Sequence, residues 1–329
     1  MPLTWLKDMR TLYIGKNDAG QRLDKFITKT LKAFPQSLLY KSVRTKKIKV
    51  NRKRCEPGQI LNAGDTVELF ISEEFFEPTA SDNAFMKLKP NIDVIYEDEN
   101  IILVNKAPGL IVHSDENEEV NTLISHIKAY LYRKGEYDPE NEQSFAPALC
   151  NRIDRNTGGI VLAAKTASAL RFFNEKIKEH ELDKFYLCAV HGKMPKKEET
   201  LSAYLKKNGD KNIVDIRNEK SQGYREIITK YKVLAEKRGL SLLEIELITG
   251  KTHQIRAHLS SIGHPLLGDG KYGINKDDRK AGYSFQALYA YKLCFSYTKN
   301  GGEFDYLSGQ CFTADRSKIS FLKEFDLQL

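Results

Sequence analysis

Residues 151–166, NRIDRNTGGIVLAAKT, join a polar loop to an apolar strand. The run that starts at Ile160 is typical of a buried strand, and Gly158 with Gly159 permits a tight turn just before it. Such a turn holds a neighbouring carboxylate rigidly and leaves space for a ligand, so Asp154 is a candidate for chemistry. Taken alone, an aspartate in a loop is more often a turn or capping residue. The rest of the chain has to decide between these two interpretations.

Further strands and a helix are predicted on both sides of this segment. Apolar or alternating runs occur in DVIYEDENIILVNK (93–106), KFYLCAVHG (184–192) and LSLLEIELI (240–248), and TASALRFFNEKIKEH (166–180) has helical spacing. Strands interspersed with helices in this way favour an α+β fold. We expect a mixed, largely antiparallel sheet with flanking helices.

A small α+β domain is predicted ahead of this sheet. RLDKFITKTL has helical spacing, a second helix is expected around 38–44, and IKVN and TVELFI are typical of short strands. The stretch that follows mixes acids, prolines and small polar residues without periodicity, as a linker does. The chain has 329 residues, and single domains cluster at roughly 100 to 200. We therefore predict a first domain at 12–75, a linker at 76–90 and a second domain at 91–329.

The charge of the chain favours a polyanionic partner. The formal net charge is +8, and each Lys or Arg that meets a phosphate releases condensed counterions. The segment 41–54, KSVRTKKIKVNRKR, contains eight basic residues and no acidic one. A solvated basic face is the simpler alternative for such a run.

Composition also bounds the location and the redox state. No apolar run approaches the roughly 20 residues that cross a bilayer, and MPLTWLKDMR lacks a secretory apolar core, so we expect a cytoplasmic protein without a membrane partner. The five cysteines are scattered and form no close pair. We predict that all five are reduced structural thiols; they are Cys55, Cys150, Cys188, Cys294 and Cys311.

The first domain resembles the S-four-like RNA-binding domain through QRLDKFI, SVRTKKIKVN and GDTVELF. A helix pair beside a basic turn can grip the backbone of folded RNA, where shape and phosphate contacts outweigh base reading. The resemblance implies that RNA is bound by Arg44, Lys46, Lys47 and Arg52. Taken singly, each of these is more simply a solvated charge.

Residues 151–166 are similar to the signature of the RluA-type RNA pseudouridine synthases, H-R-L-D-x-x-T-S-G followed by an apolar strand that ends in Ala-Lys. The matching positions are Arg152, Asp154, Thr157 and Gly159. Asn151 and Gly158 replace the usual His and Ser. Three further stretches match in family order: IYEDENIILVNKAPGLIVH, KFYLCAVHG and GKTHQIRAHLSSIGHPLLGDGKYG. In QALYAYKLCF, Tyr289 stands where a His is usual, so a role of that His is not transferred.

The resemblance implies an isomerase that detaches uracil from ribose carbon one, rotates it and rejoins it through carbon five. A carboxylate suits this chemistry because it can attack the anomeric carbon, or take a proton from the neighbouring ribose carbon, while offsetting oxocarbenium-like charge. Asp154 falls on the catalytic aspartate of the family, and both routes stay open. The resemblance pairs it with Arg256 of THQIR, whose positive charge favours the carboxylate anion.

The target base must also leave its stack, which costs a few kcal/mol. By resemblance, Arg152 fills the vacancy left by the flipped nucleotide, and Tyr186 packs on the uracil ring and assists deprotonation at carbon five. The signature makes Thr157 a substrate-binding candidate. Lys106 and Lys165 occupy family positions near the pocket, where we assign them support or phosphate contact.

The two histidines of THQIRAHL raise a metal site as an alternative. His253 and His258 are five residues apart, whereas helical zinc pairs want four. We therefore expect His253 and Gln254 to organise the loop around Arg256. Isomerisation consumes no redox equivalent, so neither a metal nor a cofactor is expected.

Two other functions stay in view, a catalytically silent RNA-binding protein and a glycosidase. The first would tolerate loss of Asp154, and the second needs another positioned acid and releases free base. For the isomerase, RNA is the expected partner and a monomer suffices. The basic first domain favours large-subunit rRNA over tRNA, although members of the family act on either.

Overall fold

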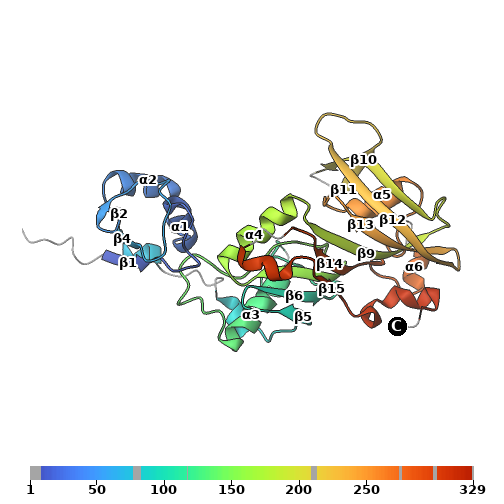
Figure 1. The fold of residues 1–329 in the computed structure, drawn as a ribbon, viewed down its shortest axis with the longest axis horizontal. Coiled ribbons are helices and arrows are strands. Elements are labelled where there is room, and N and C mark those ends of the chain that lie inside the picture. Colours follow the sequence, from blue (N-terminus) through green and yellow to red (C-terminus); the bar gives the residue numbers. More distant parts are fainter. Residues whose placement is uncertain are drawn as a thin grey trace, which may run out of the picture. The chain divides into compact units, whose positions relative to one another are not determined.

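The computed structural model describes residues 9–76, 83–116, 118–208, 213–273, 276–298 and 302–327, and the chain forms two compact units (Figure 1). The first unit extends to Pro90 and includes Ser125–Ala148 and Ala164–Ser168, and the second comprises the remainder. Six residues of the predicted linker, 77–82, lie outside the described residues. No described helix has the length and apolar character needed to span a membrane.

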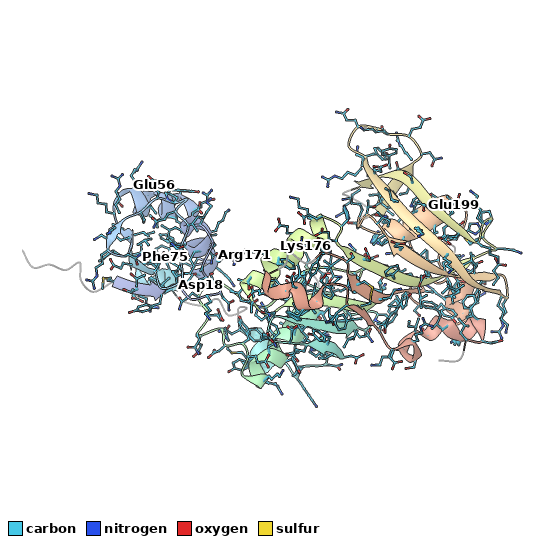
Figure 2. The ribbon with its side chains drawn as sticks, viewed as in Figure 1. Asp18, Glu56, Phe75, Arg171, Lys176 and Glu199 are labelled. Atoms are coloured by element: carbon cyan, nitrogen blue, oxygen red, sulfur yellow. A yellow bond between two sulfur atoms is a disulfide. The ribbon has the colours of Figure 1, made fainter. Side chains whose placement is uncertain are left out.

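The first unit contains a four-stranded sheet of order β1-β4-β2-β3 with two helices. The strands are β1 (Met9–Tyr13), β2 (Ile48–Val50), β3 (Lys53–Arg54) and β4 (Thr66–Phe70), and the helices are α1 (Leu23–Thr30) and α2 (Gln36–Arg44). Leu23, Phe26 and Ile27 recur at helical spacing and bury one face of α1. Figure 2 shows Phe75, whose ring meets that of Phe34 edge-on at 4.9 Å. The predicted helices and the strands IKVN and TVELFI are confirmed.

The second unit is built on a sheet that the described residues show with eleven strands. Nine of them follow the order β11-β10-β12-β13-β9-β14-β8-β6-β5, while β15 pairs with β14 and β7 with β8. Their bounds are β5 Val94–Glu97, β6 Ile101–Lys106, β7 Ala148–Leu149, β8 Gly158–Ala164, β9 Leu182–His191, β10 Glu198–Asn208, β11 Ile213–Arg217, β12 Arg225–Lys237, β13 Leu240–Leu247, β14 Leu288–Phe295 and β15 Cys311–Thr313. Neighbours from β11 to β14 are antiparallel, whereas β14 and β8 run parallel. The predicted α+β class with a mixed, largely antiparallel sheet is confirmed.

Four further helices are described, one of which was predicted; the first lies mostly in the first unit and the other three lie mostly in the second. They are α3 (Leu123–Lys134), α4 (Ala167–Lys178), α5 (Gln254–Ser261) and α6 (Lys276–Lys280), with short 3-10 turns at Glu73–Phe76, Ala84–Lys87, Gly302–Leu307, Arg316–Lys318 and Ser320–Phe325. The helical spacing of 166–180 corresponds to α4. Helix α5 packs against β11 and β12 (Figure 1). This contact brings THQIR onto the sheet.

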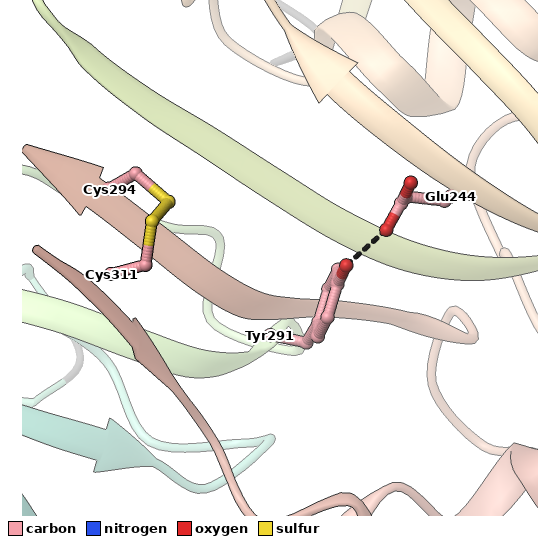
Figure 3. The surroundings of a disulfide bond; sticks show 4 residues. All are labelled: Glu244, Tyr291, Cys294 and Cys311. Atoms are coloured by element: carbon pink, nitrogen blue, oxygen red, sulfur yellow. Dashed lines mark hydrogen bonds between the residues drawn. A yellow bond between two sulfur atoms is a disulfide. The ribbon is translucent and has the colours of Figure 1, made fainter. Parts of the chain in front are cut away.

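The prediction that all five cysteines are reduced is wrong for Cys294 and Cys311, which form a disulfide (Figure 3). Antiparallel pairing of β14 with β15 sets these two residues directly opposite each other, with Cα atoms 4.1 Å apart. The 17-residue separation gave no hint of that register. The other three cysteines are free thiols. Nearby, the Tyr291 hydroxyl donates a hydrogen bond to Glu244 (Figure 3).

Candidate active site

A cavity of about 340 Å³ opens in the second unit at the loop before β8. Its walls come from residues 150–154 of that loop, from β9, from the end of β13 and from the loop that leads into α5. Of the residues predicted for the site, the cavity brings together Arg152, Asp154, Thr157, Tyr186, His253, Gln254 and Arg256. Segments from about 150 to 256 in the sequence thus meet around one space, and that space contains the candidate carboxylate.

Lys106 fixes the loop that carries Asp154. It is 1% exposed, and its ammonium donates hydrogen bonds of 2.8–2.9 Å to the carbonyl oxygens of Ala107, Leu110 and Arg155. Burial lowers the pKa of Lys106 to about 7, and the charge of Asp154 opposes that shift. Lys106 is not among the described residues that line the cavity.

The expected pairing of Asp154 with Arg256 is confirmed. Arg256 donates from Nη1 to Asp154 Oδ2 at 2.9 Å, and it donates from Nε and Nη2 to the two oxygens of Asp269 at 2.7 and 2.8 Å. The pKa of Arg256 is raised, because the hydrogen bonds and charges of Asp269 and Asp154 outweigh its burial. The Asp154 side chain is 27% exposed, and its Oδ1 has no hydrogen-bond partner among the described residues. One oxygen is therefore held by Arg256, and the carboxylate lines the cavity.

His253 and Gln254 organise the turn into α5, as predicted. His253 has a left-handed backbone (φ 53°), its Nδ1 lies 2.9 Å from the Tyr272 hydroxyl, and its Nε2 lies 3.9 Å from Asp154 Oδ2. Burial lowers the pKa of His253, with Asp154 opposing the shift. The Gln254 amide donates to the Ile228 carbonyl and accepts from the Lys251 N–H. These bonds set the first turn of the helix that presents Arg256.

Tyr186 lies on β9 with its ring in the cavity wall and is 7% exposed. Its pKa is raised by burial and, secondarily, by the Asp154 charge. Both effects favour the protonated hydroxyl. An aromatic face beside a carboxylate is suited to hold a planar base.

Three other predicted site residues, Thr157, Arg152 and Lys165, differ in their accessibility. Thr157 is 1% exposed and its hydroxyl accepts a hydrogen bond from Gln286 at 3.1 Å, which anchors the end of the loop. Arg152 is exposed at the cavity wall. Lys165 is part of the first unit, where it forms an ion pair with Glu136, and it does not line the cavity.

The four basic candidates of the first domain are all exposed. Arg44 ends α2, and Lys46 and Arg52 have left-handed backbones with φ of 62° and 63°. Lys47 follows in the turn before β2. Arg52 is 92% exposed and lies 3.8 Å from Glu68, a distance at which a solvated pair contributes little.

Two departures from the family signature compensate each other. A Cβ built on Gly158 would lie 2.5 Å from Cε2 of Tyr289, so the tyrosine ring occupies the space that a serine side chain would need. The Tyr289 hydroxyl donates to Asn105 Oδ1 at 2.6 Å, which fixes the ring. The third departure, Asn151, accepts a hydrogen bond from the Leu162 N–H at 2.8 Å and so ties the loop to β8.

Several site residues were missed from the sequence. Asp269 and Tyr272 lie in GDGKYG, which was quoted only for its match, and no local pattern joins them to Arg256. Lys184 and Lys251 also line the cavity. The available signal for Lys184 was strand periodicity, because a residue two positions before Tyr186 shares its face of β9.

Comparisons with known proteins agree with this geometry. Residues 100–261 match the family model described as RNA pseudouridylate synthase. An uncharacterized RNA pseudouridine synthase of Mycoplasma capricolum is 32% identical over 316 residues, or 95% of this chain and 99% of that protein. Ribosomal large subunit pseudouridine synthase C of Escherichia coli is 32% identical over 303 residues, or 89% of this chain and 90% of that protein.

Solved structures share the fold. Human RNA pseudouridylate synthase domain containing 4 aligns with a TM-score of 0.55 at 21% identity, covering 72% of this chain and 94% of that one. Human RNA pseudouridylate synthase domain containing 1 gives 0.52 at 22% identity, covering 73% and 86%.

Proposed function

Because this chain belongs to the RluA-type RNA pseudouridine synthases and is thus an isomerase of uridine in RNA, we propose that Asp154 is its essential carboxylate and large-subunit rRNA its substrate. The observation that carries the catalytic part is the asymmetric setting of Asp154 in the cavity. Arg256 holds Oδ2, while Oδ1 has no partner among the described residues. An oriented carboxylate with one free oxygen can meet the ribose of a bound uridine.

The arrangement supports either chemical route at that oxygen. Asp154 can attack the anomeric carbon or take a proton from the adjacent ribose carbon, and in both cases its charge offsets the oxocarbenium character that develops as uracil leaves. Arg256 keeps the carboxylate oriented, because two of its three hydrogen bonds go to the fully buried Asp269. We assign Tyr186 to the uracil ring, which it holds while the base turns.

The remaining candidates take supporting parts in the proposal. Arg152, exposed at the cavity wall, fills the stack that the flipped nucleotide leaves. Thr157, Lys106, His253 and Gln254 hold the two loops that meet at Asp154. Lys165 stays a proposed support of the strand end.

Large-subunit rRNA is favoured by two observations. One relative that matches 89% of this chain is named a ribosomal large subunit pseudouridine synthase. The exposed basic turn of the first domain, proposed to span 12–75 and to be S-four-like, suits the backbone of a large folded RNA. Its proposed contacts are Arg44, Lys46, Lys47 and Arg52. The catalytic domain is proposed to span 91–329, and the enzyme to act as a cytoplasmic monomer.

The test is pseudouridine mapping by mass spectrometry on unmodified rRNA and tRNA transcripts, each incubated with wild type, Asp154→Asn or Asp277→Asn. Asp277 is a matched control, since its side chain is 94% exposed on α6. We expect new pseudouridine in large-subunit rRNA with wild type and with the control, and none with Asp154→Asn.

Other outcomes overturn particular parts of the proposal. Modification confined to tRNA refutes the rRNA substrate, and full activity of Asp154→Asn refutes the essential carboxylate. Release of free uracil would indicate a hydrolase. RNA binding without any product in all folded transcripts would indicate the silent RNA-binding protein.

A further inference from the structure

The cavity wall carries more positive charge than the catalytic pair explains. Its charged members are Arg152, Lys184, Lys251, Arg256 and a single carboxylate, Asp154, among the described lining residues. Arg256 is balanced by Asp154 and by Asp269 behind it. The other three cations form no ion pair or side-chain hydrogen bond with any residue that the structure describes. An excess of about three cations therefore faces the space that takes the uridine.

Lys184 is the member of this group whose unpaired charge is the most unfavourable, because it is partly buried. It is half-buried on β9, two residues before Tyr186, and its Nζ lies 3.8 Å from the position of a Cβ built on Gly250. Burial lowers the pKa of Lys184, Lys251 adds to that shift and Asp183 opposes it. The Lys251 charge thus repels the Lys184 ammonium in the free protein, and a bound anion would offset that repulsion.

Another partly buried lysine of the second unit, Lys176, has acidic partners. Lys176 on α4, labelled in Figure 2, forms ion pairs with Glu181 at 2.5 Å and Glu179 at 3.2 Å. No described acid forms an ion pair or a side-chain hydrogen bond with Lys184, and Asp183 acts on it only through its charge. A cation buried for packing alone would be expected to have such a partner. The absence of one beside an open cavity favours a ligand that brings the negative charge.

The surroundings of Lys184 are suited to a phosphate. Lys251 and Thr252 line the same cavity in the exposed loop that leads into α5, so an ammonium and a hydroxyl adjoin the first turn of an eight-residue helix. Helix N-termini favour anions, and Lys binds phosphate as a mobile point charge. A uridine in RNA carries a phosphate on each side of its ribose. Because both phosphates are attached to that ribose, a ribose at Asp154 brings a phosphate into or next to the cavity.

We propose that Lys184, together with Lys251, binds a backbone phosphate adjoining the uridine that enters the cavity, and thereby holds the ribose in register with Asp154. This site rests on the proposed function, since it presumes RNA in the cavity. Lys184 acts on binding and not on bond breaking. The half-saturating RNA concentration should therefore change, while the maximal rate changes little.

The test uses an rRNA fragment in which wild type has been shown to form pseudouridine, with each phosphate flanking that uridine replaced in turn by a neutral methylphosphonate. Single-turnover rates are measured with wild type, Lys184→Gln and Lys184→Arg. The control is Lys276→Gln, which removes an exposed lysine of α6 outside the cavity. Thermal unfolding of each variant checks that the fold is retained.

We expect Lys184→Gln to raise the half-saturating concentration about tenfold, as for loss of one charged hydrogen bond. The slope of log affinity against log salt should fall by roughly 0.7, as for one phosphate contact. One methylphosphonate should weaken wild type to the same extent and leave Lys184→Gln unaffected. Lys184→Arg should stay near wild type. The control variant should match wild type in its half-saturating concentration, its salt slope and its loss of affinity for the methylphosphonate RNA.

Three results would overturn the proposal. Lys184→Gln could bind like wild type, it could lose as much as wild type from every methylphosphonate, or it could lower only the maximal rate. Each of these leaves the wild-type activity intact and so differs from failure of the proposed function, in which wild type forms no pseudouridine in the unmodified fragment.

Discussion

Gly158→Ala should destabilise the catalytic unit through one side chain, Tyr289. The new Cβ would lie 2.5 Å from Cε2 and 2.8 Å from Cδ2 of that ring, and 3.2 Å from Cδ of Pro108. The backbone at Gly158 is not left-handed, so alanine introduces no conformational strain there. The ring must retreat by about 0.9 Å to reach the 3.4 Å of ordinary contact. The cost is therefore steric.

The ring has little freedom to retreat. Tyr289 is 4% exposed and its hydroxyl is held by Asn105 at 2.6 Å. Overpacking of a close-packed core costs about 1 to 3 kcal/mol, and stretching a buried hydrogen bond adds about 1 kcal/mol. We expect Gly158→Ala to lower the free energy of unfolding by about 2 to 4 kcal/mol. The rate of pseudouridine formation by this variant should also fall, because Asp154 lies only four residues before Gly158 and a shift of the backbone there would move the carboxylate.

A double-mutant cycle in urea, followed by circular dichroism, isolates this contact. Tyr289→Ala alone should cost about 3 to 5 kcal/mol, and adding Gly158→Ala to it should cost nothing more. Gly159→Ala is the control, because its Cβ would lie 2.2 Å from the Ala290 carbonyl oxygen and the backbone there has φ of 115°. Truncating Tyr289 cannot relieve that clash. If Gly158→Ala is neutral in wild type, or equally costly beside Tyr289→Ala, the steric coupling is refuted.

Three further predictions concern the supports of the site. Lys106→Met should destabilise the fold by about 2 kcal/mol or more, because it leaves buried carbonyl groups without a hydrogen-bond donor. The pKa of Lys106 in the folded protein is lowered to about 7, so the unfolded chain binds more protons above that pH. Denaturation at several pH values should therefore show the stability of wild type relative to this variant rising from pH 7 to about 10. Arg256→Lys should lower the single-turnover rate at least tenfold with little change in RNA affinity, because one ammonium cannot hold both oxygens of Asp269 and still orient the catalytic carboxylate; an unchanged rate would contradict this. Reduction of the Cys294–Cys311 disulfide, which closes a loop of 17 residues, should lower the free energy of unfolding by about 3 kcal/mol, and the Cys294→Ser variant should show the same loss without added reductant.

The strands and helices that could be predicted are those in which consecutive residues share the same degree of burial, or alternate in it regularly. The run that became β8 is apolar at consecutive positions because both faces of that strand are buried. In contrast, β10 (EETLSAYLKKN) and β12 (REIITKYKVLAEK) alternate between buried and more exposed positions at their centres and have charged residues towards both ends. Their apolar content is too low to identify them as strands without knowledge of the sheet that they join.

The catalytic pair was predictable for a different reason. Nothing local connects Asp154 with Arg256, which lie about a hundred residues apart, and only the resemblance joined them. The resemblance assigned no role to Asp269 or Lys184. Asp269 contacts Arg256 and does not line the cavity, and Lys184 lies two residues before Tyr186, the residue of that motif to which a role was assigned. The Cys294–Cys311 bond depends on the register of two strands, which no spacing rule gives.

The parallel pairing of β14 with β8 has a consequence for how the enzyme acquires activity during folding. This pairing rests on two residue pairs, Tyr289 with Gly158 and Ala290 with Gly159, and it joins β8, β6 and β5 to the antiparallel strands of the sheet. The partners are about 130 residues apart, so closing this joint requires a large loss of chain entropy that local hairpins do not incur. The hairpins from β10 to β13 can form first, with the loop of Asp154 still unanchored. Regain of catalysis after dilution from denaturant should therefore lag behind regain of strand content.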